Sequence, residues 1–415
     1  MTGPADAACA TSVIVVSRGR PRHLVRCLTA LSHQDHPRFE VVVVADAAGL
    51  AAVRDLPVKT AAFEQANISA ARNLGLSLAS GAVVAFIDDD AVAEPTWLGR
   101  LAAPFADPLV QAATGYVRGR DGLSWQSRAA VIDRLGQTLD LPVADQAAVM
   151  MPPPAAGAIK TVGTNMAFRH ASLAGIGGFD PAIHFYLDEG DVNLRLSCRI
   201  TVISDAVVHH AFAANAGRAA DRSPTDLHEI GASLAVFLRK HARDDDPSPD
   251  EVFSWMQDQQ RRRLLRHVVT GGIEPRDVAR LLDTLSAGWA DGHSRELSTP
   301  PPVSRQNAGN FRPFPTGPAS ALRPGIVLSG RTWRARRLRT LAARHAAAGR
   351  IVTVVLLSPT ARPHRLRFTD DGYWEQSGGI FGRAGGGGPR FIWSTFRRRV
   401  GQVVGISSLY RQISA

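Results

Sequence analysis

Short apolar runs alternate with amphipathic stretches along the first part of the chain. Residues 12–17, 39–45 and 82–87 are mostly apolar runs rich in β-branched side chains, which is the pattern of strands buried on both faces. After Pro21, and again over residues 68–78, apolar positions recur at helical spacing. This alternation predicts an α/β fold, namely a doubly wound and mostly parallel sheet with helices on both faces.

The pattern becomes less regular after residue 111. The expected elements are, in chain order, a strand at 112–118, a helical stretch at 125–139, a loop rich in proline and alanine at 150–157, a strand at 161–168, a helix beginning at His170, and a final strand or strand pair at 200–209. The core of the fold is therefore expected to end near residue 215.

The second half of the chain has a different organisation. Helices are expected at 225–241, 249–270 and 275–287, and repeated prolines predict an extended linker after them. Beyond the linker, residues 325–329, 331–348 and 351–358 have the pattern of a strand, a helix and a strand. We therefore expect four parts: a core at 1–215, a helical extension at 216–298, a proline-rich linker at 299–324, and a small βαβ-like C-terminal appendage at 325–415.

The net charge of +11 comes entirely from the C-terminal part of the chain. Residues 305–415 hold 19 arginines and no lysine against 3 acidic residues, whereas acids slightly outnumber bases before them. A basic segment of this kind favours contact with an anionic membrane or a partner enzyme, and the alternative is an ordinary solvated surface rich in arginine. Nucleic-acid binding is not expected, because the only tryptophans that could stack on bases there are Trp333, Trp374 and Trp393.

The cysteines and the N-terminus favour a cytoplasmic protein. Cys9, Cys27 and Cys198 lie far apart without CxxC spacing, as expected for free thiols in a reducing compartment. Residues 1–10 lack the basic start of a secretory signal, and no apolar segment approaches the length of a membrane span. Association with the inner face of a membrane through the basic appendage remains compatible with this expectation.

Three consecutive aspartates, Asp88, Asp89 and Asp90, directly follow the apolar run at 82–87. The carboxyl ends of strands are where open α/β sheets bind ligands. Adjacent carboxylates repel one another unless a divalent cation, usually with phosphate oxygens of its own, lies between them. The triplet therefore predicts a metal and phosphate site, and the alternative is a solvated turn or a helix N-cap ahead of Pro95.

A second acidic cluster contains Asp188, Glu189 and Asp191 and stands before a helical pattern. It can supply a general base, and the alternative is a helix N-terminus whose acids interact with the helix dipole. His209 and His210 end a later apolar run. An imidazole at such a strand edge can complete a metal site beside the aspartates, although packed structural histidines are more common.

Five segments in one order carry a resemblance to a known family. They are SVIVVSRGRPRHLVRCL, ISAARNLGLSLASGAVVAFIDDDA, GTNMAFR, GGFD and DEGDVNLRL. In this order and spacing the chain resembles the family 2 glycosyltransferases over residues 11–215. The resemblance implies the GT-A fold and an inverting enzyme that uses a nucleoside-diphosphate sugar.

The resemblance also implies a metal centre. The family's DxD element matches Asp88 to Asp90, whose carboxylates are expected to hold Mg²⁺ or Mn²⁺ against the diphosphate of the donor. Asp88 is expected nearer the nucleotide, with Asp89 beside it, and Asp90 nearer the metal. His210, and less readily His209, matches the late histidine that completes the metal shell.

Other matched positions surround the donor. Asp46 matches the acid that contacts the nucleotide base, and Ser17 ends the first strand where the nucleotide pocket begins. Arg72 and Asn73 match an element close to the nucleotide, where Arg72 either binds phosphate or braces the acidic site. The nearby Arg18 and Arg20 are expected at the surface, with phosphate as an alternative partner.

The catalytic base belongs to an acidic element that is usually written ED followed by xD. Aligning on Arg195 puts Asp188 and Glu189 on the ED pair, so that the usual acid order is swapped, and Asp191 on the later Asp. The base is therefore left open between Asp191 and Glu189, with Asp188 third. Asn165 and Phe179 are expected to line the acceptor side, and Trp97 and Trp125 either stack on sugar or pack in the core.

The sequence thus supports a metal-dependent inverting glycosyltransferase that modifies a glycan or a lipid-linked acceptor, in cell-surface polysaccharide synthesis. The alternative is a catalytically impaired protein that binds a sugar nucleotide or acts as a scaffold, with the swapped acid order as its sign.

Overall fold

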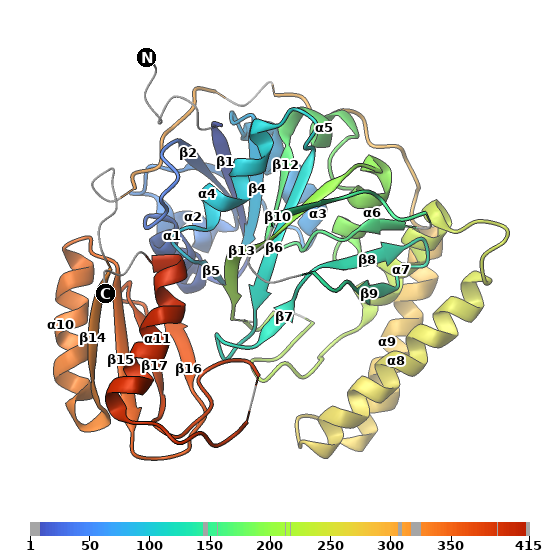
Figure 1. Ribbon diagram of the computed structural model, residues 1–415. Coiled ribbons are helices and arrows are strands. Elements are labelled where there is room, and N and C mark those ends of the chain that lie inside the picture. Colours follow the sequence, from blue (N-terminus) through green and yellow to red (C-terminus); the bar gives the residue numbers. More distant parts are fainter. Residues whose placement is uncertain are drawn as a thin grey trace.

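Among the described residues, ten strands form one mixed β-sheet at the centre of the molecule (Figure 1). The computed structural model describes residues 9–143, 148–155, 157–211, 213–215, 217–305, 309–316, 325–387 and 389–411. The main path of the sheet runs β10-β13-β6-β12-β4-β1-β2-β3, with β5 beside β13 and β7 beside β6.

One half of the sheet is entirely parallel. Its strands are β1 (Thr11–Ser17), β2 (Phe39–Ala45), β3 (Lys59–Ala62) and β4 (Val83–Asp88). In the register of this half, Ser17 lies beside Ala45 and Val16 lies beside Asp88. The carboxyl ends of β1, β2 and β4 therefore meet at one edge, which is where the acidic triplet begins.

Helices cover both faces of this sheet, as expected. On one face lie α1 (Pro21–Leu31), α2 (Ala47–Val53), α4 (Trp97–Ala102) and a short 3₁₀ helix, η1 (Ala103–Ala106); on the other lie α3 (Ile68–Leu78), α5 (His170–Gly175) and α6 (Asp188–Leu196). Successive side chains of β1 alternate between the two cores: Val13 and Val15 join one cluster and Ile14 the other. The doubly wound α/β prediction is confirmed.

The other half of the sheet is mixed. It contains β5 (Ala91–Ala93), β6 (Ala112–Arg118), β7 (Trp125–Ser127), β10 (Ala148–Met151), β12 (Met166–Arg169) and β13 (Ile200–His210). β12 is antiparallel to both β4 and β6, β13 is parallel to β6, and β10 and β5 are antiparallel to β13. The expected strands at 112–118 and 200–209 are confirmed.

The helical prediction for residues 125–139 is wrong. This stretch contains β7, β8 (Ala130–Asp133) and β9 (Thr138–Asp140), and β8 alternates buried and half-buried side chains at the period of a strand. The turn after β8 is stabilised by Asp133, whose side chain accepts hydrogen bonds from the Leu135 and Gln137 amides, while Gly136 adopts φ 75°. These local bonds favour a hairpin over a helix.

Two neighbouring expectations need smaller corrections. Part of the expected loop at 150–157 is strand, because β10 reaches Met151 and β11 (Gly157–Ile159) begins at its end. The expected strand at 161–168 begins only at Met166, since a turn precedes it in which the Asn165 amide donates to the Val162 carbonyl. β11, β8 and β9 form a separate small sheet.

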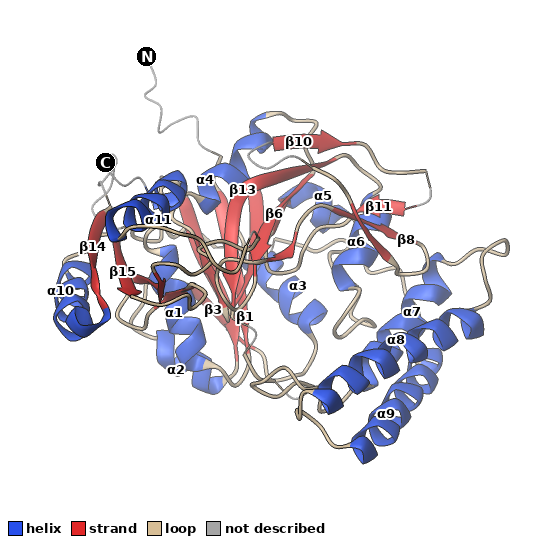
Figure 2. Ribbon diagram, turned by 60° about the horizontal axis from the view of Figure 1, so that its bottom comes forward, coloured by secondary structure: helices blue, strands red, loops and turns tan. Residues whose placement is uncertain are grey.

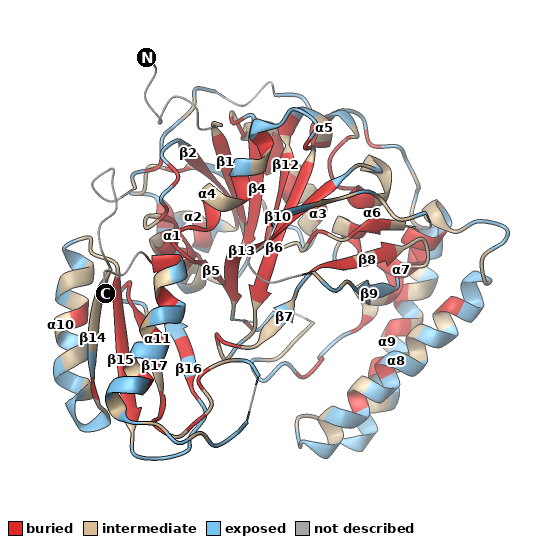
Figure 3. Cartoon of the chain, viewed as in Figure 1, coloured by how far each residue is buried: buried red, intermediate tan, exposed pale blue. Residues whose placement is uncertain are grey.

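The helical extension follows the core. It contains α7 (His228–His241), α8 (Pro249–Val269) and α9 (Pro275–Ser294), and in Figure 2 these helices group at one side of the molecule, beyond α6. α7 is buried along most of its length, and its Phe237 packs in one cluster with Ile132 of β8 and Leu187 before α6. The outer surfaces of α8 and α9 are largely exposed (Figure 3).

The C-terminal appendage is a small α/β unit. Its strands are β14 (Ile326–Arg331), β15 (Val352–Ser358), β16 (Arg365–Phe368) and β17 (Trp374–Gly379), in the order β14-β15-β17-β16. α10 (Ala335–Ala347), which follows the 3₁₀ helix η2 (Thr332–Arg334), packs on one face of this sheet and α11 (Phe396–Arg411) on the other. β14 and β15 are parallel, and α10 lies between them in the chain, which is the βαβ order that the sequence pattern predicts.

The appendage packs directly against the core. Leu366, Phe368 and Trp374 share a buried cluster with Leu123, Val92 and Ala30 of the core. In the described part of the chain, no helix is both long enough and apolar enough to cross a bilayer.

We expect Gly115→Ala to lower the free energy of unfolding by about 2 kcal/mol, since overpacking a tight interior has a cost of this order. A Cβ at Gly115 in β6 would lie 2.1 Å from the Ala206 carbonyl oxygen and 2.5 Å from Nδ2 of Asn165. Urea unfolding followed by circular dichroism measures the effect. The matched control is Gly175→Ala, where a Cβ meets no atom within 4 Å; equal stabilities of the two variants would contradict the prediction.

Candidate functional site

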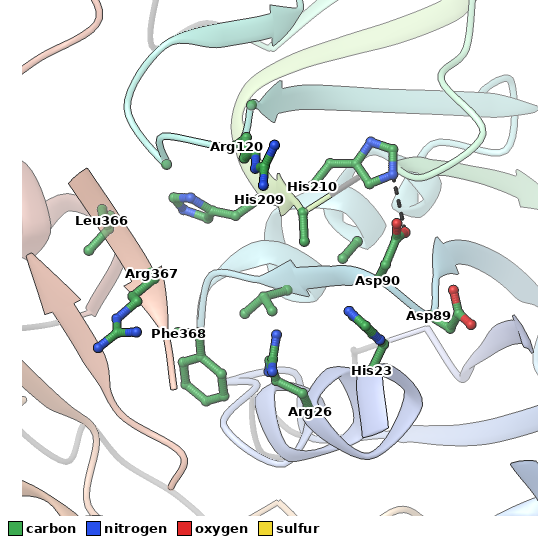
Figure 4. Close-up of a pocket in the computed structure, with 15 residues that line it drawn as sticks. His23, Arg26, Asp89, Asp90, Arg120, His209, His210, Leu366, Arg367 and Phe368 are labelled. Atoms are coloured by element: carbon green, nitrogen blue, oxygen red, sulfur yellow. Dashed lines mark hydrogen bonds and ion pairs between the residues drawn. The ribbon is translucent and has the colours of Figure 1, made fainter. Parts of the chain in front are cut away.

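The acidic triplet and the histidine pair are brought together by a short antiparallel ladder. β5 follows the triplet directly, and in its register Ala91 lies beside His210 and Val92 beside His209. One ligand atom from each of Asp88, Asp90 and His210 falls within 4.8 Å of the others. His210 Nε2 lies 3.1 Å from Asp90 Oδ1 and 3.9 Å from Asp88 Oδ2 (Figure 4 draws the contact with Asp90).

Asp90 is a buried carboxylate that is held ionised. Its Oδ2 accepts a hydrogen bond of 2.6 Å from the Ala213 amide, and Arg20 approaches it to 3.2 Å. Burial alone would raise the pKa of Asp90, but the hydrogen bond and charge of His210, together with the charge of Arg20, hold it well below its usual range. A permanently charged carboxylate of this kind is suited to a divalent cation.

Asp89 points away from this cluster into the protein. The Ser17 hydroxyl donates to Asp89 Oδ2 at 2.7 Å, and Arg20 lies 2.7 Å from Oδ1. Burial raises the pKa of Asp89 to about 7, although Arg20 opposes the shift. The structure thus engages Ser17 and Asp89 with each other. Arg18 is exposed as expected, whereas Arg20, expected at the surface, lies between Asp89 and Asp90.

Arg72 of α3 connects the two acidic clusters. Its side chain is 4% exposed, contacts Asp188 directly, and lies 3.5 Å from Asp88 Oδ1. It also donates to the Gly163 carbonyl at 3.2 Å, and its guanidinium lies 5.2 Å from the centre of the Phe179 ring. Of the two roles expected for Arg72, bracing of the acidic site matches these contacts.

Asn73 holds a turn rather than presenting its amide to a cavity. It donates to the Phe179 carbonyl at 2.7 Å and accepts from the Phe179 amide at 2.8 Å. Asp46 caps α2 by accepting from the Gly49 amide at 2.8 Å, and its second oxygen accepts from the Gly19 amide at 2.6 Å. Asp46 therefore ties the loops after β1 and β2 together at the edge that carries the triplet.

The second acidic cluster begins α6 after an unusual backbone corner. Tyr186 and Leu187 both adopt left-handed conformations, with φ of 70° and 67°, which are uncommon for non-glycine residues and often mark functional sites. Asp188 and Asp191 are buried in the first turn, while Glu189 keeps partial exposure.

Three basic side chains form ion pairs with the carboxylate of Asp191. It lies 2.7 Å from Arg195, 2.5 Å from Lys240 and 2.9 Å from His241, and the last two belong to α7. Burial opposes ionisation, but His241, Arg195 and Lys240 hold the pKa of Asp191 well below its usual range. These contacts attach α6 to the helical extension.

Asp188 and Glu189 share a hydrogen bond. Burial raises the pKa of Asp188 to about 8 against the opposing charge of Arg72. Burial would raise the pKa of Glu189 as well, but the charge of Lys160 and the hydrogen bond with Asp188 lower it. Of the two carboxyl groups, Glu189 is therefore the one that ionises more readily.

Several residues expected near a ligand pack in the core instead. Asn165 donates to the Tyr116 and Ala206 carbonyls and accepts from the Trp97 ring nitrogen at 2.8 Å, with no exposed surface on Asn165 or Trp97. Phe179 is equally buried. The expectation that Asn165 and Phe179 line the acceptor side is wrong, and Trp97 packs in the core. Arg118 lies over the Trp125 ring at 4.0 Å.

His209 turns away from Asp88 and Asp90. Its Nε2 lies 2.8 Å from Glu94 Oε1, and its ring packs 4.8 Å from the Trp374 ring. A cavity of about 90 Å³ has both histidines in its lining, together with Asp89, Asp90, His23, Arg26, Arg120 and residues 366–368 of the appendage (Figure 4). The role of Glu94 was not anticipated, although it follows the triplet closely in sequence.

The donor set of Asp88, Asp90 and His210 fits Mg²⁺ or Mn²⁺. Both ions accept carboxylate oxygens, and Mn²⁺ also accepts imidazole nitrogen. The Asp88 side chain is 28% exposed, so the cluster opens on one side toward a ligand.

One family model matches part of the chain. Residues 12–170 match the family model described as Glycosyl transferase family 2. No curated protein matches the chain significantly.

Several solved structures resemble the chain at low identity. A mannosyltransferase from Pyrobaculum calidifontis with GDP-Man and Mn²⁺ is 19% identical over 70% of this chain and 89% of its own, with a TM-score of 0.42. S. aureus TarS 1–349 with UDP-GlcNAc is 18% identical over 68% and 89%, with a TM-score of 0.41. GalNAc-T7 with UDP, GalNAc and Mn²⁺ is 14% identical over 55% and 48%, with a TM-score of 0.39. The chain spans about half the length of GalNAc-T7 and of a further S. aureus TarS structure.

We expect Arg72→Met to lower the free energy of unfolding by about 3 kcal/mol, because it removes the buried cation that compensates the charge of Asp88 and of the Asp188–Glu189 pair. The measurement is urea unfolding at neutral pH. Arg22→Met is the matched control, since Arg22 is 87% exposed and lies 3.8 Å from Asp370; a loss of similar size in both variants would contradict the assignment of Arg72 to a buried bridge.

Proposed function

Residues 12–170 belong to glycosyl transferase family 2, and on that premise we propose that this protein is a metal-dependent, inverting glycosyltransferase. It transfers a sugar from a nucleoside-diphosphate sugar to a hydroxyl of a glycan or lipid-linked acceptor, in cell-surface polysaccharide synthesis. The observation that carries the proposal is the meeting of Asp88, Asp90 and His210 at the carboxyl edge of the sheet, connected to a second acidic cluster by Arg72.

Asp88, Asp90 and His210 hold the divalent cation in this proposal. When bound, Mg²⁺ or Mn²⁺ neutralises the charge that develops on the departing nucleoside diphosphate. Arg20 and the Ala213 amide fix the orientation of Asp90. Ser17 and Asp89 support this arrangement from within the protein, as their mutual hydrogen bond and their contact with Arg20 indicate.

We assign the donor nucleotide to the edge beside Asp46. This residue joins the loops after β1 and β2 and keeps partial exposure, so that it can contact the base of the donor. Arg72 and Asn73 support the site through contacts within the protein. Arg72 holds Asp188 and Asp88 in place, and Asn73 fixes the turn at Phe179.

Glu189 is the proposed catalytic base. Its carboxylate accepts the proton of the acceptor hydroxyl while the hydroxyl oxygen bonds to the anomeric carbon and the nucleoside diphosphate leaves from the opposite face. Asp188 shares a hydrogen bond with Glu189 and is itself held by Arg72. Asp191 is a structural residue, because Arg195, Lys240 and His241 occupy it. The swapped acid order thus puts the shorter side chain against Arg72 and the longer one toward the acceptor.

The appendage carries the remaining part of the proposal, which is contact with an anionic membrane surface or a pathway enzyme. The 19 arginines of residues 305–415, 16 of them in the appendage, favour such a partner over a nucleic acid, for which stacking aromatics are sparse. Two of these arginines form ion pairs inside the appendage, because Arg339 and Arg367 both contact Glu375. We place the protein in the cytoplasm, with peripheral association at the inner face of the membrane.

A second candidate is a catalytically impaired protein that binds a sugar nucleotide without transferring it. The observation in its favour is the Asp188-Glu189 order, which departs from the family pattern. Turnover of the donor separates the two candidates.

We expect Glu189→Gln to reduce kcat by about 10²- to 10⁴-fold, the usual contribution of a general base, with nucleotide affinity unchanged. Initial rates of nucleoside-diphosphate release and calorimetric binding of the nucleotide measure the two quantities. Asp140→Asn is the control, because Asp140 is an exposed acid of the neighbouring small sheet. Wild-type turnover by Glu189→Gln would remove Glu189 as the base, and absence of turnover in the unmodified protein would favour the impaired candidate.

We expect Asp90→Asn and His210→Gln each to weaken Mn²⁺-dependent nucleotide binding at least tenfold, because each removes one ligand atom from the cluster. A thermal-shift screen of UDP, GDP and dTDP and their sugars, with and without Mn²⁺, first identifies the nucleotide. Calorimetry then compares the variants with Asp55→Asn, whose side chain is 88% exposed. Nucleotide binding that is equally tight in all variants would place the metal elsewhere.

A further inference from the structure

Glu94 and Arg411 form a buried ion pair between the core and the appendage. Each is 1% exposed. Arg411, in the last turn of α11, donates from Nε to Glu94 Oε2 at 2.9 Å and from Nη2 to Glu94 Oε1 at 2.7 Å. This two-point geometry is the strong form of an arginine–carboxylate contact.

The pair is built into its surroundings on both sides. On the appendage side, Arg411 also donates to the Thr353 hydroxyl at 3.2 Å and lies 4.0 Å over the Trp374 ring. On the core side, Glu94 is 2.8 Å from His209 Nε2, and His209 packs against the same tryptophan. The contacts leave Glu94 little freedom to move.

Glu94 lies at one end of the β5–β13 ladder, and Asp90 and His210 of the candidate metal cluster lie at the other end. The Glu94 amide donates to the Val207 carbonyl at one end, and the Ala211 amide donates to the Asp90 carbonyl at the other. Between them, β5 and β13 pair from Ala91 to Ala93. Asp90 directly precedes β5 and His210 ends β13, so the pairing of these two strands sets the separation of Asp90 and His210.

We infer that Arg411 is a positioning residue for the divalent cation: by holding Glu94 and His209, the appendage fixes the ladder that places Asp90 and His210 at ligand distance. The inference rests on the proposed function, since it requires a cation at Asp88, Asp90 and His210. It gives the appendage a role within the active site as well as a surface role.

Two polar contacts between the core and the appendage lie outside the β5–β13 ladder. Asp370 of the appendage accepts from Arg26 of α1 at 2.8 Å, at a partly exposed position. Leu409 accepts from Arg100 of α4 through its carbonyl at 2.6 Å. Loss of the Asp370 contact loosens the attachment of the appendage without touching β5 or β13, which makes it a matched control.

The experiment uses the full chain and Mn²⁺ alone, titrated by electron paramagnetic resonance, which needs no turnover. We expect Arg411→Met to weaken Mn²⁺ binding about tenfold, the lower end of the range for residues that orient metal ligands. Arg411→Lys should recover part of the affinity, because an ammonium restores the charge but not the two-point contact. Asp370→Asn should bind Mn²⁺ as the unmodified protein does.

Mn²⁺ affinity of folded Arg411→Met within twofold of the unmodified protein overturns the inference, even if its melting temperature falls, because a purely structural role predicts that combination. Equal weakening by Asp370→Asn also overturns it, since loosening of the whole appendage would then be the cause. If Arg411→Met does not fold, Glu94→Gln combined with Arg411→Met removes both buried charges, and normal Mn²⁺ binding by that variant is the contrary result.

The proposed metal site is tested separately by Asp90→Asn. If Asp90→Asn binds Mn²⁺ as tightly as the unmodified protein, the metal site itself is wrong and the inference falls with it. If Asp90→Asn weakens binding and Arg411→Met does not, the metal site stands and the role of Arg411 alone is lost.

Discussion

Arg72 lies between two groups of carboxylates that would otherwise repel one another. Its guanidinium reaches Asp88 on one side and Asp188 on the other from a nearly inaccessible position, and the Phe179 ring covers its face. Without a buried cation between them, the carboxylates of Asp88 at the end of β4 and Asp188 at the start of α6 would be uncompensated charges. The candidate metal cluster and the candidate base therefore belong to one electrostatic unit, although 100 residues separate Asp88 from Asp188.

The contact with Arg72 gives a physical explanation for the swapped order of Asp188 and Glu189. Asp188 fits against Arg72 within the protein, and the neighbouring Glu189 extends further from the same helical turn. Asp191 faces α7, where Lys240 and His241 meet it. The three acids of one short sequence motif thus have three different environments, which are set by the elements that each one faces.

The local pattern of apolar and polar residues predicts much of the fold. The runs at 12–17, 39–45 and 82–87 are dominated by apolar and β-branched residues, and the strand–helix order that they predict is the observed one. Residues 125–139 were misassigned because their hairpin depends on the Asp133 side chain and on the left-handed Gly136, which an apolar count ignores. The order of motifs brought Asp88, Asp90 and His210 into one hypothesis, and the structure brings their ligand atoms together. Pairings such as Asp191 with Lys240, or Glu94 with Arg411, join elements whose relative placement no local pattern encodes.

The Glu94–Arg411 pair also has a consequence for the synthesis of the protein. The two residues are 317 positions apart, so a ribosome that adds roughly 5 to 20 residues per second makes Glu94 about a quarter of a minute to a minute before its partner. During that interval Glu94 lacks the arginine that compensates its charge in the folded protein, so burial of its carboxylate is costly until α11 has been made.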